Sequence, residues 1–346
     1  MSHVLYPLEF EPIYKPKVWG GRKLERLGRT LPGGNDERIG ESWEIADLSS
    51  TAPGGGGGGE ARSRVANGPL RGATLHDLLK EYGPALHGTL PLTARGEFPL
   101  LVKFLDAREN LSVQVHPSPT YAAEHPEAHL KSEAWYVVEA DPGAVIYKGL
   151  AEGVTAEQVR NAVQRNTADA VEPLLRQVPA EAGDCHYLPS GTVHALGAGV
   201  LVAEVQTPSD TTFRLFDWGR TGRELHVEQA IASMLFQPIP FEQYQPRKPI
   251  EHAEGKRQTL VRCEHFQIER FDVQAGATWE IVMNHRPGIW MVLEGSGTIE
   301  GEAMEPVSLE RGKTVLLPAE MPAATLRVHE PLVYLDVRFP QGELIA

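Results

Sequence analysis

One segment of this chain occurs twice. Residues 183–197, GDCHYLPSGTVHALG, align with residues 312–326, GKTVLLPAEMPAATL, so that their glycines and first prolines coincide. Upstream, SEAWYVVEA aligns with PGIWMVLEG, which places Trp135 over Trp290. Copies of a repeated unit adopt the same supersecondary structure. The chain is therefore predicted to contain one β-rich unit in two copies.

The two copies differ in their polar residues. In the same alignment, Glu133 of the first copy falls on Gly288, and His194 falls on Ala323. Because only the first copy has these polar residues, we expect a single functional site, in the first half of the chain.

Between the repeats, short β-branched runs alternate with Gly and Pro, which is typical of a sandwich or barrel. Two windows, 73–90 and 155–178, instead carry apolar residues at helical spacing. Thr155 and Gln158 match a capping box at the start of the second window. Helical segments of this size in a β protein are usually insertions between strands. The glycine run 54–59 lacks the Lys-Ser/Thr and the following helix of a phosphate loop, so we interpret it as a linker.

The charge balance excludes some partners. The chain has 33 basic and 46 acidic residues, a net charge of −13, which argues against a general binder of nucleic acid or of an anionic membrane. A small anionic substrate needs only a few local cations and stays compatible. The two cysteines, Cys185 and Cys263, have no metal-type spacing and indicate a reduced compartment. With no apolar run long enough to span a membrane or act as a signal peptide, we expect a cytoplasmic protein.

The stretch LSVQVHPSP, residues 111–119, alternates like a strand. Val113 and Val115 share one face, and Gln114 and His116 share the other. If the valines pack in a core, the amide and the imidazole face something polar.

A second pattern explains what that something is. Gly183-x5-Pro189-x-Gly191-x2-His194 resembles the second motif of the cupin barrel, a small double-sheet jelly roll. The first cupin motif supplies two ligands from adjacent inward positions and a carboxylate further on. The corresponding metal ligands in this chain are Gln114, His116, Glu133 and His194. Two imidazoles, a carboxylate and an amide oxygen leave coordination positions open, as catalytic zinc sites do, so one Zn²⁺ per chain is predicted; Mn²⁺, Fe²⁺ and Co²⁺ fit the same ligands.

A longer series of motifs resembles type I mannose-6-phosphate isomerase in its short bacterial form. In order from residue 14 to 220, the motifs are YKPKVWGG, GESWEIAD, FPLLVKFLDARENLSVQVHPS, LKSEAWYV and YLPSGTVHALGAGVLVAEVQTPSDTTFRLFDWGR. The resemblance implies a mainly β fold of two cupin (jelly-roll) barrels with a small helical insertion at about 151–181. We expect a catalytic domain over 1–245 and a second, metal-free cupin domain over 246–346.

The resemblance also implies an activity. Members of this family interconvert mannose 6-phosphate and fructose 6-phosphate through a cis-enediol, with zinc. The expected partner is a sugar phosphate, with neither nucleic acid nor membrane, and the expected assembly is a monomer or homodimer.

Four further residues match the family's site, namely Arg214, Lys131, Asp210 and Lys103, and Glu204 and Trp19 look like lining residues of the same pocket. The catalytic candidates are Arg214, Lys131 and Asp210, and the substrate-binding candidates are Lys103, Glu204 and Trp19. An Arg in an otherwise apolar strand needs an anion, which favours a functional Arg214. Asp210 could equally stabilise a turn after Pro208 and Ser209, and Trp19 could be a core residue.

One departure from the family leaves the proton-transfer base open. Longer members carry His before the Lys of the Lys-x-Glu motif and Pro after it, where this chain has Leu130 and Ser132. His125, His129, Lys131 and Asp210 are the alternatives for the base.

Two other functions stay open from the residues alone. One is an isomerase acting on glucose 6-phosphate, and the other is a non-catalytic sugar-phosphate-binding cupin. A pure binding module has no need of four ligands together with Lys131, so we favour an enzyme. A metal-dependent oxygenase would not explain the phosphate-type cations.

Overall fold

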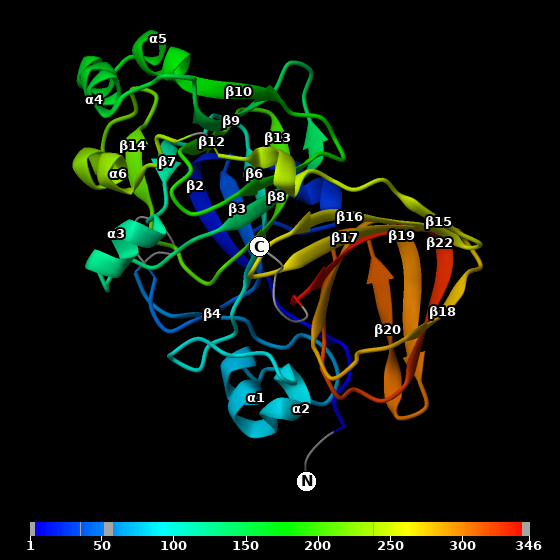
Figure 1. Ribbon diagram of the computed structural model, residues 1–346. Helices are drawn as coiled ribbons and strands as arrows, with labels where there is room; N and C mark the ends of the chain where they lie inside the picture. Colours follow the sequence, from blue (N-terminus) through cyan, green and yellow to red (C-terminus); the bar gives the residue numbers. More distant parts are fainter. Residues whose placement is uncertain (1–3, 35, 52–57, 238, 341–346) are drawn as a thin grey trace.

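The computed structural model describes residues 4–34, 36–51, 58–237 and 239–340, and shows layered sheets with short helices at the periphery (Figure 1). Strands make up most of its regular structure, which confirms the mainly β prediction. Residues 54–57 of the glycine run lie outside the described residues, so the linker interpretation stays a prediction.

The central layer is a six-stranded antiparallel sheet in the order β11-β8-β13-β6-β2-β3. Its strands are β2 (Ile13–Gly21), β3 (Ile39–Ile45), β6 (Leu101–Ala107), β8 (Glu133–Ala140), β11 (Cys185–Leu188) and β13 (Val200–Gln206). Both faces of this sheet are covered, so β6 is buried along its whole length. Phe104 and Leu105, which point to opposite faces, belong to two different apolar clusters.

A five-stranded sheet, in the order β10-β9-β12-β7-β14, packs against one face of the central sheet. Its strands are β7 (Val113–Val115), β9 (Val145–Leu150), β10 (Leu175–Pro179), β12 (His194–Leu196) and β14 (Phe213–Phe216). Val113 and Val115 pack beneath helices in an apolar cluster with Val163 and Ile231. Gln114 points the other way, between the two sheets. The alternation predicted for this strand is confirmed.

Helices cover the outer face of the five-stranded sheet (Figure 1). They are α4 (Ala156–Arg165), α5 (Ala168–Val171), the 3-10 helix η2 (Glu172–Leu174) and α6 (Val227–Ser233). The predicted capping box of Thr155 and Gln158 is present at the start of α4. The helical pattern predicted through residue 178 ends earlier, because Leu175–Pro179 form β10 and pair with β9. Backbone pairing at the sheet edge outweighs the helical spacing of these residues.

The other helices are short, and two of them, α1 (Leu75–Tyr82) and α2 (Pro84–His87), pack against the apolar cluster that contains Phe104. The predicted helical window at 73–90 forms α1 and α2, with Thr74 as the N-cap. The remaining short elements are η1 (Lys23–Leu27), α3 (Pro119–Glu124), η3 (Phe241–Tyr244) and the ribbon of β4 (Asp47–Leu48) with β5 (Ala61–Arg62).

A nine-stranded sheet contains the C-terminal third of the chain. Its strands are β1 (Leu8–Glu9), β15 (Ile250–His252), β16 (Gly255–Arg262), β17 (Gln267–Val273), β18 (Thr278–Ile281), β19 (Gly288–Gly301), β20 (Met304–Glu310), β21 (Thr314–Leu317) and β22 (Ala324–Arg338). Phe266 and Met291 join Phe104 in the apolar cluster between this sheet and the central one. Strand β1 pairs with β21, so one N-terminal strand belongs to the C-terminal sheet.

The internal repeat is visible in the strand register. In the first copy β8 pairs with β11, with Glu133 opposite Leu188. In the second copy β19 pairs with β21, with Gly288 opposite Leu317. These pairs coincide in the sequence alignment, so the two copies share one strand pairing.

Two smaller expectations concern thiols and membranes. Cys185 and Cys263 are buried free thiols, as expected for a chain without a disulfide framework. Within the described part of the chain, every helix is too short or too polar to cross a lipid bilayer.

Candidate metal centre and active site

Two rows of polar side chains face each other between the central and five-stranded sheets. Cα pairing in the five-stranded sheet sets one row in the order Arg214, Gln114, His194 and Lys148. In the central sheet the facing row is Lys103, Glu204, Trp135 and His186. Residues directly opposite in antiparallel strands share a face. The two rows form one polar layer inside the sandwich, close to residues that the sequence predicts to bind metal.

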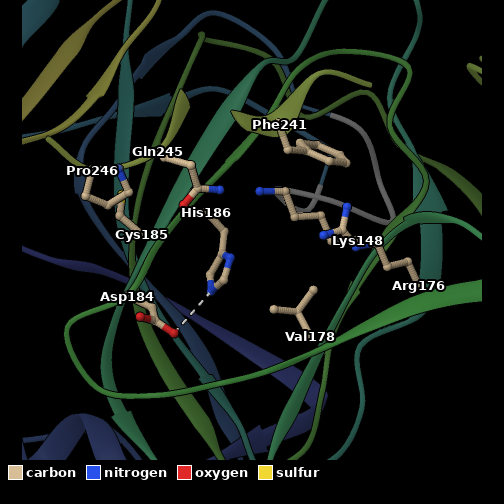
Figure 2. A pocket seen from close by; sticks show the side chains of 9 residues that line it. All are labelled: Lys148, Arg176, Val178, Asp184, Cys185, His186, Phe241, Gln245 and Pro246. Carbon is tan, nitrogen blue, oxygen red and sulfur yellow. Dashed lines mark ion pairs between the residues drawn. The ribbon is translucent and has the colours of Figure 1, made fainter. Parts of the chain in front are cut away.

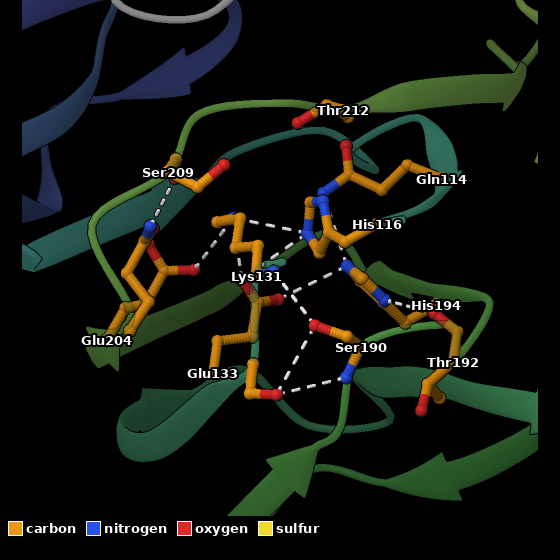
Figure 3. A network of polar contacts seen from close by, with 12 residues as sticks. Gln114, His116, Lys131, Glu133, Ser190, Thr192, His194, Glu204, Ser209 and Thr212 are labelled. Atoms are coloured by element: carbon orange, nitrogen blue, oxygen red, sulfur yellow. Dashed lines mark hydrogen bonds and ion pairs between the residues drawn. The ribbon is translucent and has the colours of Figure 1, made fainter. Parts of the chain in front are cut away.

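Three of the four predicted ligands converge in this layer. His116, Glu133 and His194 are fully buried, and one donor atom from each lies within 4.8 Å of the others. His194 Nε2 lies 3.2 Å from Glu133 Oε1, and His116 Nε2 lies 3.4 Å from Glu133 Oε2 (Figure 3).

Backbone carbonyls fix which ring nitrogens face the cluster. The Nδ1–H of His116 donates to the carbonyl of Thr211 at 2.9 Å, and the Nδ1–H of His194 donates to the carbonyl of Thr192 at 2.8 Å. In a neutral imidazole this leaves Nε2 as an acceptor, the arrangement typical of metal-binding histidines. Burial, aided by the nearby Lys131 ammonium, lowers the pKa of His116 to about 3, so the ring is neutral at pH 7.

The cluster therefore needs a cation. Burial alone would raise the pKa of Glu133, but the Lys131 ammonium holds it well below its ordinary value, so the carboxylate is ionised. His194 Nε2 and Glu133 Oε1 are then two acceptors that face each other. Acceptors at this distance repel unless a cation lies between them. The donor set fits a metal ion.

Gln114 lies at the edge of the cluster. Its Nε2 is 3.3 Å from His194 Nε2, and its Oε1 accepts a hydrogen bond from Ser112 Oγ at 3.3 Å. Rotation of the amide by 180° exchanges the two atoms and turns the oxygen toward the cluster. Gln114 thus lies beside the cluster, and its role as a metal ligand stays a prediction.

The Lys131 ammonium contacts the same cluster. Its Nζ lies 2.6 Å from Glu133 Oε2, 3.2 Å from His116 Nε2 and 3.9 Å from Glu204 Oε1. The backbone N–H of Lys131 donates to Ser190 Oγ at 2.8 Å. This bond holds the Lys-x-Glu segment against the turn that leads into His194.

That turn depends on a glycine. Gly191 has φ of +90°, and a Cβ there would meet Leu235 Cγ at 2.8 Å. Its N–H donates to the carbonyl of His116 at 3.0 Å. The Pro-x-Gly spacing of the cupin-type motif thus joins the segments that carry His116 and His194.

A cavity of about 490 Å³ opens beside the cluster. It is lined by all six of the predicted catalytic and substrate-binding residues: Trp19, Lys103, Lys131, Glu204, Asp210 and Arg214. Gln114 also lines it. His125 and His129, the histidine alternatives for the base, are not among the lining residues; His125 stacks on Tyr121, and His129 lies beside Arg95.

The wall formed by the central sheet carries alternating charges. Lys103 Nζ lies 3.0 Å from Glu204 and 3.7 Å from Glu41. Burial opposes the ammonium, but these carboxylates raise the pKa of Lys103 above its ordinary value. Burial likewise opposes the carboxylate of Glu41, yet Lys17 and Lys103 lower its pKa to about 2. The ammonium of Lys103 and the carboxylate of Glu41 are therefore both charged at neutral pH.

Arg214 lies on the opposite wall. It is buried, and its Nη1 donates to the carbonyl of Glu224 at 2.8 Å. Its Nε has no hydrogen-bond partner among the described residues. Burial and the nearby Arg223 lower its pKa, which indicates a guanidinium poorly compensated by anions. Arg214 can therefore still donate to an anionic ligand.

Sequence reasoning missed part of the wall. Glu41, Trp43 and Lys17 line the cavity, as do Arg223 and His226. The alternation of Glu41 and Trp43 in GESWEIAD was the available signal. The alternation alone does not show which face of this strand points into the cavity, and the structure supplies that information.

Comparison with known proteins gives a consistent result. Residues 8–146 match the family model of the type I phosphomannose isomerase catalytic domain. Mannose-6-phosphate isomerase ManA of Bacillus subtilis is 35% identical, with 90% of this chain and 93% of that protein covered. The mannose-6-phosphate isomerase of Streptococcus mutans is 39% identical, with 90% and 92% covered.

Solved structures agree. The crystal structure of the mannose 6-phosphate isomerase from Bacillus subtilis has a TM-score of 0.82 and 31% identity, with 97% of this chain and 100% of that chain covered. A mannose 6-phosphate isomerase crystallised with zinc and yttrium shares the fold, with a TM-score of 0.72, 17% identity and coverage of 97% and 100%.

Proposed function

The chain belongs to the type I phosphomannose isomerases, aldose–ketose isomerases of mannose 6-phosphate, and we propose that it works at the cavity beside His116, Glu133 and His194 with one zinc ion. One observation carries this placement. Six residues predicted to touch the substrate line one cavity, and the candidate metal ligands adjoin it.

The proposed zinc ligands are His116, Glu133 and His194, with the amide oxygen of Gln114 as the fourth. A bound Zn²⁺ would act as a Lewis acid that polarises the sugar carbonyl. A mannose 6-phosphate isomerase of the same fold was crystallised with zinc, which supports the choice of zinc. The three-acceptor cluster supports the metal itself.

The reaction moves one proton between two carbons. A base removes the proton on C2 of open-chain mannose 6-phosphate, the electrons of that C–H bond form the C1–C2 double bond, and the C1 carbonyl oxygen takes up a proton, which gives the cis-enediol. Return of a proton to C1 and loss of the C2 hydroxyl proton give the ketone of fructose 6-phosphate. The protein must hold the anionic oxygens and carry the proton.

We assign these tasks among the cavity residues. Lys131 lies against the metal cluster, so its ammonium can donate to the reacting oxygen. Glu204 is a poor base because it accepts from Trp135 Nε1 at 2.9 Å and pairs with Lys103. Asp210 lines the cavity and is half-buried, and we propose that it carries the proton.

The cationic side chains bind the anionic oxygens of the substrate in this proposal. Arg214 and Lys103 lie on opposite walls of the cavity, and charge-assisted hydrogen bonds from guanidinium and ammonium groups suit phosphate and enediolate oxygens. Trp19, which is buried, forms an apolar part of the wall.

The proposal extends to the architecture and the setting. The central and five-stranded sheets would form one cupin barrel over 1–245, and the C-terminal sheet would form the second, metal-free barrel over 246–346. Strand β1 comes from the first range but pairs with β21 in the sheet of the second. The shared strand register of the two repeats supports this division. Two free buried thiols support a cytoplasmic setting.

Turnover of mannose 6-phosphate by the purified protein tests the proposal, before and after EDTA, with zinc add-back and with glucose 6-phosphate as the control substrate. We expect activity that EDTA abolishes, zinc restores and glucose 6-phosphate does not share. A folded, metal-loaded protein that turns over neither sugar would contradict the proposal and indicate a sugar-phosphate-binding protein.

A further inference from the structure

A second, smaller cavity lies at the other end of the same polar layer. It has a volume of about 240 Å³, and its lining includes Lys148 and His186 (Figure 2). Lys148 is paired across strands with His194, and His186 is paired with Trp135. His194 and Trp135 therefore lie between this cavity and the candidate active site, and the two cavities are lined by different residues.

Lys148 is a buried ammonium without a counterion among the described residues. Lys148 is only 7% exposed to solvent. Over the described residues, no carboxylate oxygen lies within 4.0 Å of its Nζ, and its close contact is with the Phe241 ring, 4.2 Å from the centroid. A buried charge is costly unless it is paired. The cavity beside Lys148 is the place where a partner would fit.

A second cation shares the same aromatic ring. The guanidinium of Arg176 lies 5.8 Å from the Phe241 centroid and also lines the cavity. Burial first, and repulsion from Arg176 as well, lower the pKa of Lys148 to about 8, which still leaves most of the ammonium protonated at pH 7. An anion bound between the two cations would offset both the burial of the Lys148 charge and its repulsion by Arg176.

Further polar groups complete the lining. His186 is buried, and its Nε2 has no hydrogen-bond partner among the described residues. Asp184 Oδ2 lies 4.0 Å from that nitrogen, at the opposite end of the cavity from Arg176 (Figure 2). The three potential donors come from three strands, with Lys148 on β9, Arg176 on β10 and His186 on β11.

We propose that this cavity binds a phosphate group, either as free phosphate or as part of a small phosphorylated metabolite. Lys148 and Arg176 supply charge-assisted hydrogen bonds, and His186 adds a neutral N–H donor. Donors from three strands around one cavity suit a tetrahedral oxyanion better than a planar carboxylate. The Asp184 carboxylate disfavours a second anionic group and suits a ligand hydroxyl. The site is independent of the isomerase assignment.

Chemical labelling of Lys148 tests the proposal directly. An amine-acetylating reagent near pH 8 modifies Lys148, and peptide mass spectrometry reports its rate beside that of the exposed Lys80. We expect phosphate to slow the acetylation of Lys148 and to leave Lys80 unchanged. Sodium chloride at equal ionic strength should protect neither lysine. Equal protection by chloride would overturn the proposal, because it would indicate screening rather than a site.

Variants separate this cavity from the active site. Arg176→Gln should raise the phosphate concentration for half-protection about tenfold, since a hydrogen bond to a charged group is removed. Arg214→Ala, which alters only the larger cavity, should leave protection of Lys148 unchanged. The opposite result would overturn the proposal: Arg214→Ala would lose the protection of Lys148, and Arg176→Gln would keep it. The isomerase assignment would stay intact.

Two ligands distinguish the source of the phosphate. Protection by mannose 6-phosphate at a lower concentration than inorganic phosphate indicates a phosphorylated metabolite, and similar concentrations indicate the phosphate group alone. Both results support the site, and protection by neither compound refutes it. If Lys148 resists acetylation altogether, calorimetric titration with phosphate decides: the wild type should bind one equivalent more than Lys148→Met, and equal stoichiometry refutes the site.

Discussion

Replacement of Arg214 by alanine tests where the substrate lies. Arg214 is 8% exposed, and its Nη1 is already engaged by the carbonyl of Glu224. Its Nε and Nη2 are left for the anionic oxygens of the substrate. Each charge-assisted hydrogen bond contributes about 1.5–3 kcal/mol. Two such bonds correspond to about 3–6 kcal/mol, or a loss of about 10²- to 10⁴-fold in kcat/KM.

The assay separates binding from chemistry. Initial rates of mannose 6-phosphate isomerisation give kcat and KM, and elemental analysis gives the zinc content of the same sample. We expect unchanged zinc, because Arg214 contacts none of the three acceptor atoms of the cluster. A rise in KM alone would assign Arg214 to the phosphate, whereas a fall in kcat would assign it to the enediolate.

A matched control removes a guanidinium far from the cavity. Arg327→Ala breaks an exposed ion pair with Glu300 on the C-terminal sheet and should leave both constants unchanged. If Arg214→Ala, correctly folded and loaded with zinc, kept wild-type turnover, the substrate would not lie against β14. The placement of the reaction in this cavity would then be refuted.

Three other perturbations probe the metal cluster and the charged wall. His194→Ala should lose zinc and activity together, since it removes one of three converging donors; zinc retained at one equivalent would contradict the ligand set. Zinc at about 100 times its Kd stabilises the native state by about 2.7 kcal/mol, so EDTA should lower the Tm measured by calorimetry, and an unchanged Tm would argue against a buried site. The pKa of Glu41 falls from 4.5 to about 2 on folding, so its ionised form contributes about 3 kcal/mol of stability above pH 4.5 that is lost as the pH falls toward 2. Denaturant unfolding of Glu41→Gln should lack that part of the acid dependence; identical pH profiles would show that Lys17 and Lys103 do not stabilise the carboxylate.

The sequence predicted the elements whose signal is local. Alternation placed Gln114 and His116 on one face, and a capping box marked the start of α4 at Thr155. The repeat singled out Glu133 and His194, because their counterparts are Gly288 and Ala323. The first two inferences needed only the spacing within one segment, and the third needed the alignment of two segments.

Features that depend on how sheets pack could not be predicted. Strand β1 joins the C-terminal sheet through β21, more than 300 residues away along the chain. Likewise, Lys148 and Arg176 become neighbours only because β9 and β10 pair and Phe241 packs over both. Nothing in the local spacing of these residues indicates a shared cavity.

The comparison of the two repeats also separates structural from catalytic roles in the polar layer. In the first copy, Trp135 is paired with Glu204, whose carboxylate contacts the cation of Lys103 at 3.0 Å. In the second copy, Trp290 is paired with Asp336, whose carboxylate contacts Arg338 at 2.7 Å.

A buried carboxylate between a tryptophan and a cation is therefore present in both copies, although only the first retains the metal cluster among the described residues. Its persistence without a metal indicates that the carboxylate helps to hold the layer together. The two oxygens of Glu204 are engaged by Trp135 and Lys103, so we propose that Glu204 orients Lys103 in the proposed substrate site. Glu133 has no such counterpart, since Gly288 occupies its place, which supports our proposal that the chemistry is confined to the first copy.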